Sequence, residues 1–245
     1  MRMLGSDAAM VNTSAEEYPQ LISLAVHEFR TPASVVGGYL RMLQRDPENP
    51  LTDRQRKMVE EAEKSCARLV ALIAELSDIG KLDAGLISLQ KESIDLFALL
   101  EEVAAHVHEA EDRDVRLQLR GEATGGLMNG DAARLRPAFD ALFRAILREK
   151  AGPATVVVDR RRVETNGHIL AVVTVSESST VQDAYERPRQ PFDEKRGGLG
   201  LALPLARRVF ESHAGRLLGP QSLPDQSGGD PVSRGSVIVE LPLTE

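Results

Sequence analysis

The sequence predicts an α+β protein in which an antiparallel helical hairpin precedes a two-layer α/β sandwich. Two observations support this prediction. Over the first 85 residues, apolar side chains recur at three- and four-residue steps, as they do on amphipathic helices. After Lys81-Leu-Asp-Ala-Gly85 the pattern changes to short alternating runs separated by helical stretches. We therefore expect a hairpin domain over residues 14–85 and a second domain over residues 86–245.

The first helix is expected to begin at Ser14, because Ser14 and Glu17 have the spacing of a capping box. Residues 1–13 would then form a disordered tail. Asp46-Pro-Glu-Asn-Pro50 should end this helix after Arg45, since proline lacks an N–H donor. The stripe predicted to be buried consists of Ile22, Ala25, Phe29, Ala33, Val36, Leu40 and Leu43.

A second capping-box signal, Thr52 with Gln55, should begin the next helix. Its apolar stripe consists of Val59, Ala62, Cys66, Leu69, Ile73 and Leu76. A single hairpin has one apolar seam and little to bury it against. Pairing two copies into a four-helix bundle solves this problem, so we expect a homodimer.

One histidine lies on the outer face of the first helix. At about 100° per residue, His27 falls roughly opposite the apolar stripe, with Glu28 beside it and Thr31 one turn further on. Taken alone, this arrangement is typical of any solvent-facing histidine on an amphipathic helix.

The second domain shows strand and helix patterns in irregular order. The helical patterns cover residues 95–112, 131–149 and 200–214, and residues 221–234 are predicted to form a mobile loop. A glycine-rich stretch, Gly197-Gly198-Leu199-Gly200-Leu201, opens the last helix. The predicted strands are Val115–Leu119, Thr155–Val158, Ile169–Val175 and Ser236–Leu241.

Composition excludes several classes of function. The net charge is −7, and no basic run is long enough to indicate nucleic-acid binding; Arg160-Arg161-Arg162 is interpreted as a solvated strand end. Cys66 is the only cysteine, which excludes an intramolecular disulfide and a cysteine metal cluster. No signal peptide or membrane-spanning apolar run is present, so the sequence predicts a cytoplasmic protein.

His27-Glu-Phe-Arg-Thr-Pro32 resembles the phosphoacceptor box of two-component sensor histidine kinases. Further blocks follow in the order of that family and cover nearly the whole chain. They are Leu76–Gly85, Gly130-Asp131 with Arg134-Leu135, Gly197–Leu203, His213–Arg216 and Gly235–Leu243. The resemblance implies a dimerisation and histidine-phosphotransfer hairpin followed by an ATPase-like domain of the type shared with gyrase.

The resemblance also implies roles for individual residues. His27 would carry a phosphoryl group, and Glu28 would act as its general base or orienting acid. Thr31 matches the position that orients a water for removing phosphate from a response regulator. ATP with Mg²⁺ would be the cofactors, and the glycine loop would approach the phosphates with its backbone N–H groups. A receiver domain is expected to dock below His27, near Gly37, Gly38 and Arg41.

The sequence departs from the family at the ATP site. The two expected magnesium-binding asparagines fall on Ala141 and Ala145, and alanine cannot bind a metal. Ser176 replaces the aspartate that recognises adenine, and the stretch from there to Gly198 is short for a nucleotide lid. Arg148 keeps the usual positive charge, whereas Asp140 and Glu177 are offset by one residue from the missing ligands.

Three hypotheses follow. The preferred one is a phosphohistidine protein that exchanges phosphate with a response regulator or receives it from an intact histidine kinase, with its own ATP site impaired. The second is a conventional histidine autokinase with atypical ATP ligands. The third is a non-catalytic adaptor that binds a receiver domain or a kinase, although the His27 face counts against it.

Overall fold

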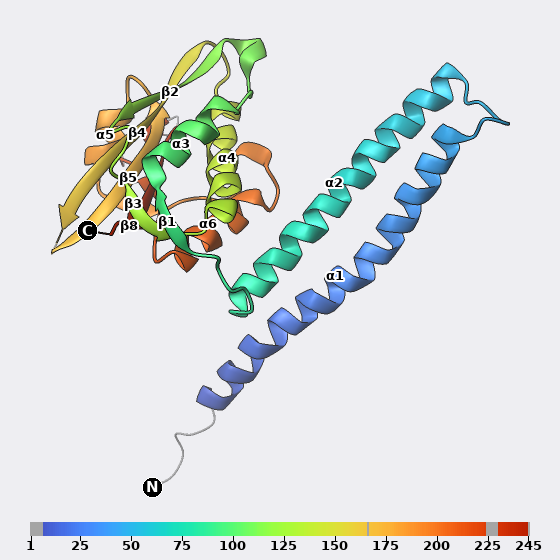
Figure 1. Ribbon diagram of the computed structural model, residues 1–245, viewed down its shortest axis with the longest axis horizontal. Helices are drawn as coiled ribbons and strands as arrows, with labels where there is room; N and C mark the ends of the chain where they lie inside the picture. Colours follow the sequence, from blue (N-terminus) through green and yellow to red (C-terminus); the bar gives the residue numbers. More distant parts are fainter. Residues whose placement is uncertain (1–6, 166, 224–229, 245) are drawn as a thin grey trace, which may run out of the picture. The chain divides into compact units, whose positions relative to one another are not determined.

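The computed structural model describes the backbone of residues 7–165, 167–223 and 230–244, together with their side chains except those of residues 7–17 and Arg196. The chain divides into two compact units, Met1–Ile87 and Ser88–Glu245 (Figure 1). The first is a helical hairpin and the second a mixed α/β unit, which confirms the predicted α+β class. Among the described residues, no helix combines the length and apolarity that crossing a membrane requires.

The hairpin consists of α1 (Asp7–Arg45) and α2 (Asp53–Asp83). The predicted start of the first helix at Ser14 is wrong, because α1 already begins at Asp7. The predicted start of the second helix is confirmed. Thr52 is the N-cap of α2, and it exchanges hydrogen bonds with Gln55 in a complete capping box.

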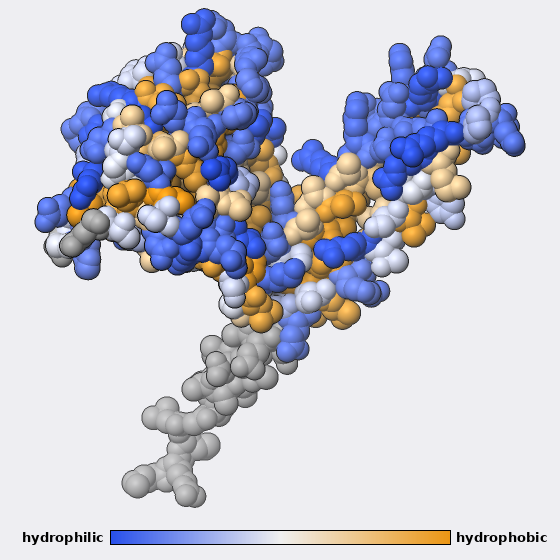
Figure 2. All heavy atoms as spheres, viewed as in Figure 1, coloured by the Kyte–Doolittle hydropathy of each residue, from blue (hydrophilic) through white to orange (hydrophobic). Residues whose placement is uncertain are grey.

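The predicted apolar stripe of α1 is wider than its contact with α2. Val26 is buried and Gly37 packs against Cys66, whereas Phe29, Val36 and Leu43 are each about half exposed. The hairpin alone therefore does not bury these three residues, and their burial between two copies of the chain stays a prediction. Figure 2 shows apolar residues gathered on the surface of the hairpin. These side chains stay exposed because the one neighbouring helix, α2, covers only one flank of α1.

The second unit is built on a six-stranded sheet with the order β2-β4-β5-β8-β7-β6. The β2 and β4 strands are parallel, and all other neighbours are antiparallel. A separate two-stranded sheet pairs β1 with β3. The strands are β1 (Glu92–Asp95), β2 (Val115–Gly121), β3 (Leu127–Gly130), β4 (Ala154–Thr165), β5 (His168–Glu177), β6 (Arg189–Pro191), β7 (Arg216–Pro220) and β8 (Val237–Pro242).

Helices cover the sheet on both faces. One face carries α3 (Leu96–Ala105), α4 (Ala132–Arg148) and α6 (Ala202–Ser212), and a short helix, α5 (Val181–Glu186), lies on the other (Figure 1). Successive residues of β4 mark the two faces, because Arg160 reaches α3 while Arg161 reaches α5. The core includes a cluster of phenylalanines, in which the ring of Phe139 lies 4.9 Å from Phe210 and 6.2 Å from Phe143.

Several local predictions need correction. The helix predicted over 95–112 ends at Ala105, and a 3₁₀ turn, η1 (Glu111–Arg113), follows the left-handed residue Ala110. Arg160 is buried and donates to the carbonyl oxygen of Phe97 at 3.0 Å, so it is not part of a solvated strand end.

The prediction of a mobile loop over residues 221–234 is also wrong for its last part. That part forms a short helix, α7 (Pro231–Arg234), which follows the buried Asp230. Residues 224–229 of the same prediction lie outside the described part of the chain.

Candidate functional site

His27 projects into solvent from the middle of α1. Its side chain is 80% exposed, and its Nδ1 lies 3.3 Å from Oε1 of Glu28. When Nδ1 carries the ring proton and donates it to this carboxylate, Nε2 keeps a free lone pair that faces solvent. Thr31, one turn further along, is also exposed. The structure thus places the three predicted residues of the hairpin on one accessible surface.

The same face of α1 carries apolar side chains. Leu24, Val35 and Met42 are each more than half exposed, and their spacing of 11 and 7 residues aligns them in one stripe with Thr31. Gly38 adds open space to this stripe, since nothing lies within 4 Å of the position a Cβ would take. Gly37, by contrast, is buried against Cys66, which corrects the expectation that it helps to form a docking surface.

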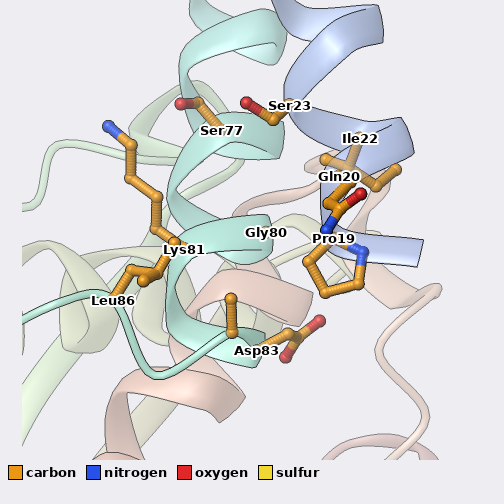
Figure 3. A pocket seen from close by; sticks show the side chains of 10 residues that line it. Pro19, Gln20, Ile22, Ser23, Ser77, Gly80, Lys81, Asp83 and Leu86 are labelled. Carbon is orange, nitrogen blue, oxygen red and sulfur yellow. The ribbon is translucent and has the colours of Figure 1, made fainter. Parts of the chain in front are cut away.

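A groove of about 580 Å³ lies at the base of the hairpin between α1 and α2 (Figure 3). Ser23, one turn before His27, and Ser77 of α2 are among its lining residues, together with the ammonium-bearing Lys81. The approach of the two helices here is close, because a Cβ on Gly80 would lie 2.9 Å from Ile22. Sequence reasoning missed this groove, because the lining residues of α1 and those of α2 are more than 50 positions apart in the sequence.

In the second unit, α4 holds both positions where magnesium ligands were expected. Ala141 and Ala145 are buried. The neighbouring charges are engaged elsewhere: Asp140 accepts from Arg144 at 2.7 Å, and Arg148 lies 3.0 Å from Glu109. The hydrogen bond from Arg148 holds the pKa of the Glu109 carboxyl below its usual value. Within the described part of the chain, no three His, Cys, Asp or Glu side chains cluster closely enough to hold a metal ion.

Ser176, the second-last residue of β5, occupies the position where an adenine-binding aspartate was expected. Its side chain is fully buried, and its hydroxyl lies 2.6 Å from that of Ser236 and 2.9 Å from that of Thr180. The adjacent Glu177 forms an ion pair with Lys150 at 3.2 Å. Ser176 and Glu177 therefore both have partners within the protein.

The glycine loop, residues 197–201, joins the short 3₁₀ turn η2 (Arg196–Gly198) to α6. Gly197, Gly198 and Gly200 all have positive φ, between 62° and 68°, which glycine adopts without strain. Gly197 lies against α4, because a Cβ at this position would be 2.8 Å from Cβ of Ala145. Leu199 and Leu201 are half-buried. The loop thus touches the helix at the position of a missing asparagine.

A second histidine shows that exposure and a carboxylate partner do not by themselves define the site. His108 is 72% exposed, and its Nδ1 lies 2.9 Å from Oε1 of Glu111. This pairing resembles that of His27 and Glu28, but His108 stands in a connecting loop without the flanking apolar stripe. His108 therefore provides a natural control for experiments on His27.

Comparison with known proteins gives independent information. The family model described as the His Kinase A (phospho-acceptor) domain matches residues 20–85. The alginate biosynthesis sensor protein KinB of Pseudomonas aeruginosa is 25% identical over 202 residues, which are 81% of this chain and 34% of KinB. The sensor protein DivL of Caulobacter vibrioides is 29% identical over 197 residues, 77% of this chain and 24% of DivL. The chain thus spans about a quarter to a third of these two relatives.

Solved structures resemble the chain in fold. Full-length ShkA in complex with AMPPNP has a TM-score of 0.66 at 20% identity, over 93% of this chain and 46% of ShkA. The histidine kinase AdeS of Acinetobacter baumannii has a TM-score of 0.55 at 15% identity, over 89% of this chain and 98% of AdeS. At these identities the likeness concerns the fold, including the hairpin followed by the sheet unit.

Proposed function

Because this chain belongs to the two-component sensor histidine kinase family, we propose that it carries a phosphoryl group on His27 and exchanges it with the receiver domain of a response regulator. The observation that supports this role most directly is the combination of an exposed His27 ring with Thr31 and a flanking apolar stripe on the same face of α1. Glu28 engages Nδ1, and Nε2 is left exposed to solvent. A phosphorylated partner reaches such an atom without any rearrangement of the hairpin.

The chemistry follows from the two ring nitrogens. Nε2 attacks the phosphorus of an aspartyl phosphate on the receiver, so that an N–P bond forms while the P–O bond to the aspartate breaks and the carboxylate leaves. The positive charge that develops on the ring is centred near Nδ1–H, where the Glu28 carboxylate stabilises it or accepts the proton. The reverse reaction returns the phosphoryl group to a receiver. Thr31 is assigned to orienting a water that hydrolyses the receiver's phosphate.

Two flanks of α1 suit two different partners. The stripe of Leu24, Val35 and Met42 beside His27 offers apolar area for the receiver, with Gly38 as an open notch. A second copy of the chain is assigned to the other exposed flank, which carries Phe29, Val36 and Leu43. Pairing there completes a four-helix bundle and leaves His27 accessible. The protein is therefore assigned as a homodimer.

The ATP site is proposed to be impaired, so that the phosphoryl group comes from a partner. Relatives with intact sites would hold ATP with Mg²⁺ at this place, but Ala141 and Ala145 have no side-chain oxygen for the metal. The Ser176 hydroxyl is buried and already hydrogen-bonded to Ser236 and Thr180. Contact between Gly197 and Ala145 also fills the space between the loop and α4. The donor is either a phosphorylated receiver or an intact histidine kinase.

A second candidate is a conventional autokinase with atypical ligands. The glycine loop favours it, because three positive-φ glycines before a helix are typical of a loop that binds phosphates through backbone N–H groups. Under this alternative the loop would have to move away from α4 when nucleotide binds.

The test follows phosphate from a labelled donor. A receiver domain phosphorylated with radiolabelled acetyl phosphate is mixed with the wild-type protein, with His27→Ala and with the matched control His108→Ala. Label should reach the wild type and His108→Ala but not His27→Ala, and size-exclusion chromatography with light scattering should find dimers of all three. Label on His27→Ala would refute the assignment of His27. Labelling of the wild type by magnesium-ATP alone would support the autokinase instead.

A further inference from the structure

We infer that the segment between β5 and the glycine loop, residues 181–196, is a fixed strap that holds the glycine loop against α4, and not a mobile lid. The strap comprises α5, β6 and the turn that leads to Gly197. Two of its arginines pair with buried carboxylates: Arg187 with Asp230, which precedes α7, and Arg189 with Glu240 of the sheet. This inference concerns the ATPase-like unit alone and does not depend on phosphate transfer at His27.

The first anchor joins the strap to α7. Arg187, at the end of α5, is nearly buried and forms an ion pair with Asp230 and a second one, at 2.7 Å, with Asp183. Asp230 also accepts from the backbone N–H groups of Leu223 and Val232. A single carboxylate thus holds the strap, the start of α7 and the chain beyond β7 together.

The second anchor lies on the sheet. Arg189 in β6 forms an ion pair with Glu240 of β8, and Arg216 of β7 contacts the other oxygen of the same carboxylate at 2.5 Å. The backbone of β6 pairs with β7, which makes the strap the edge strand of the sheet. Because Glu240 is buried, moving Arg189 away would remove one of the two cations that compensate its charge.

The third anchor is aromatic. The guanidinium of Arg161 lies 3.9 Å from the ring centre of Tyr185 in α5 and donates to Gln182 at 2.7 Å. The same guanidinium lies 2.6 Å from the buried carboxylate of Asp159. The orientation of Arg161 is therefore fixed by the sheet, and Tyr185 and Gln182 of α5 contact its guanidinium.

The strap is also held close to the glycine loop. Phe192 is buried, and Glu194 forms an ion pair with Arg207 of α6. Only residues 193–196 separate Phe192 from Gly197, so little free chain remains for a swinging motion. Anchored on both sides, the loop keeps Gly197 on Ala145, and any ligand that enters between them must first release the strap.

Hydrogen exchange of the full chain tests this inference. The variant Asp230→Asn keeps the size of the side chain and its acceptor for Val232 but weakens the ion pair with Arg187. The matched control is Asp114→Asn, which weakens the exposed pair with Arg116 on β2. In the wild type, the amides of residues 189–200 should exchange much more slowly than those of a free chain. Asp230→Asn should raise these rates at least tenfold and leave β4 and the control unchanged.

The second variant, Arg189→Gln, acts at a different anchor and leaves Glu240 paired with Arg216. It should accelerate exchange in the same residues, and it keeps the test decisive if Asp230→Asn does not fold. Exchange of residues 193–200 at free-chain rates in the wild type would overturn the inference. Unchanged rates in the folded variants would do the same. Phosphorylation of His27 by the labelled receiver, measured on the same variants, should not change.

Discussion

Replacing Ala145 by asparagine, the residue expected at this position, should destabilise the ATPase-like unit without creating a nucleotide site. Ala145 is fully buried, and Gly197 lies close enough that its own Cβ would be 2.8 Å from Cβ of Ala145. Asparagine adds three heavy atoms at this contact. Overpacking costs about 1–3 kcal/mol, and burial of an unpartnered amide costs about 1–3 kcal/mol more. The expected loss is therefore roughly 2–6 kcal/mol.

The assay should report on this unit alone. Hydrogen exchange of buried amides in α4 measures the free energy of opening the unit that contains them, so Ala145→Asn should accelerate their exchange by a factor of roughly 30 or more. Ala133→Asn is the matched control, because it makes the same change at an exposed position of the same helix. It should cost less than about 1 kcal/mol.

Nucleotide binding provides the decisive second measurement. Calorimetric titration with AMPPNP and Mg²⁺ should detect no binding to the wild type or to Ala145→Asn at millimolar nucleotide. A variant that is as stable as the control and binds nucleotide at micromolar concentration would refute the reasoning. It would mean that the gap between Gly197 and α4 opens readily and that only a ligand was missing.

Two further predictions concern other parts of the molecule. Thr31→Ala should leave phosphate acceptance by His27 intact but lower the rate at which the protein dephosphorylates its receiver, measured by loss of label from the phosphorylated receiver; an unchanged rate would rule out the role assigned to Thr31. Acidification should destabilise the second unit through His213. Burial lowers the pKa of this histidine below 6.5, and its Nε2 accepts from the N–H of Asp131 at 2.9 Å, which requires the neutral ring. The unfolded chain then binds more protons, so stability should fall as pH drops below about 6.5 and should stay level just above it. Urea unfolding across this range checks the sign, and stability that rises on acidification would contradict it.

Local patterns predicted much of the hairpin. The capping box at Thr52 and Gln55 is a short-range signal, and the structure forms it as expected. The exposure of His27 followed from helical periodicity alone. Periodicity could not separate the apolar residues of α1 that α2 buries from those, such as Phe29 and Val36, that the single chain leaves about half exposed. An apolar stripe indicates that burying its side chains is favourable, but it does not identify the surface that covers them.

Predictions for the second unit failed where long-range pairs decide the structure. The segment 221–234 has the composition of a loop, yet Asp230 is buried because Arg187, 43 residues earlier, provides its counter-charge. Arg160 lies in a basic triplet, but its guanidinium binds the carbonyl of Phe97, 63 residues away. No local pattern contains such partners. The substitutions at the expected ATP site could be located by aligning sequence motifs. The contact between Gly197 and Ala145 could be found only in the three-dimensional structure.

The fold of the ATPase-like unit persists because the large side chains of its core and the expected magnesium-ligand positions are different residues. Phe139, Phe143 and Phe210 hold α4 and α6 together and are fully buried. The positions where magnesium ligands were expected, Ala141 and Ala145, alternate with Phe139 and Phe143 along α4, and the small side chain of Ala145 lets the glycine loop close on the helix. Losing the ligands therefore removes no large apolar contact and adds a close one. A unit altered in this way keeps its architecture, and in the function we propose the reactive chemistry of the chain lies at His27.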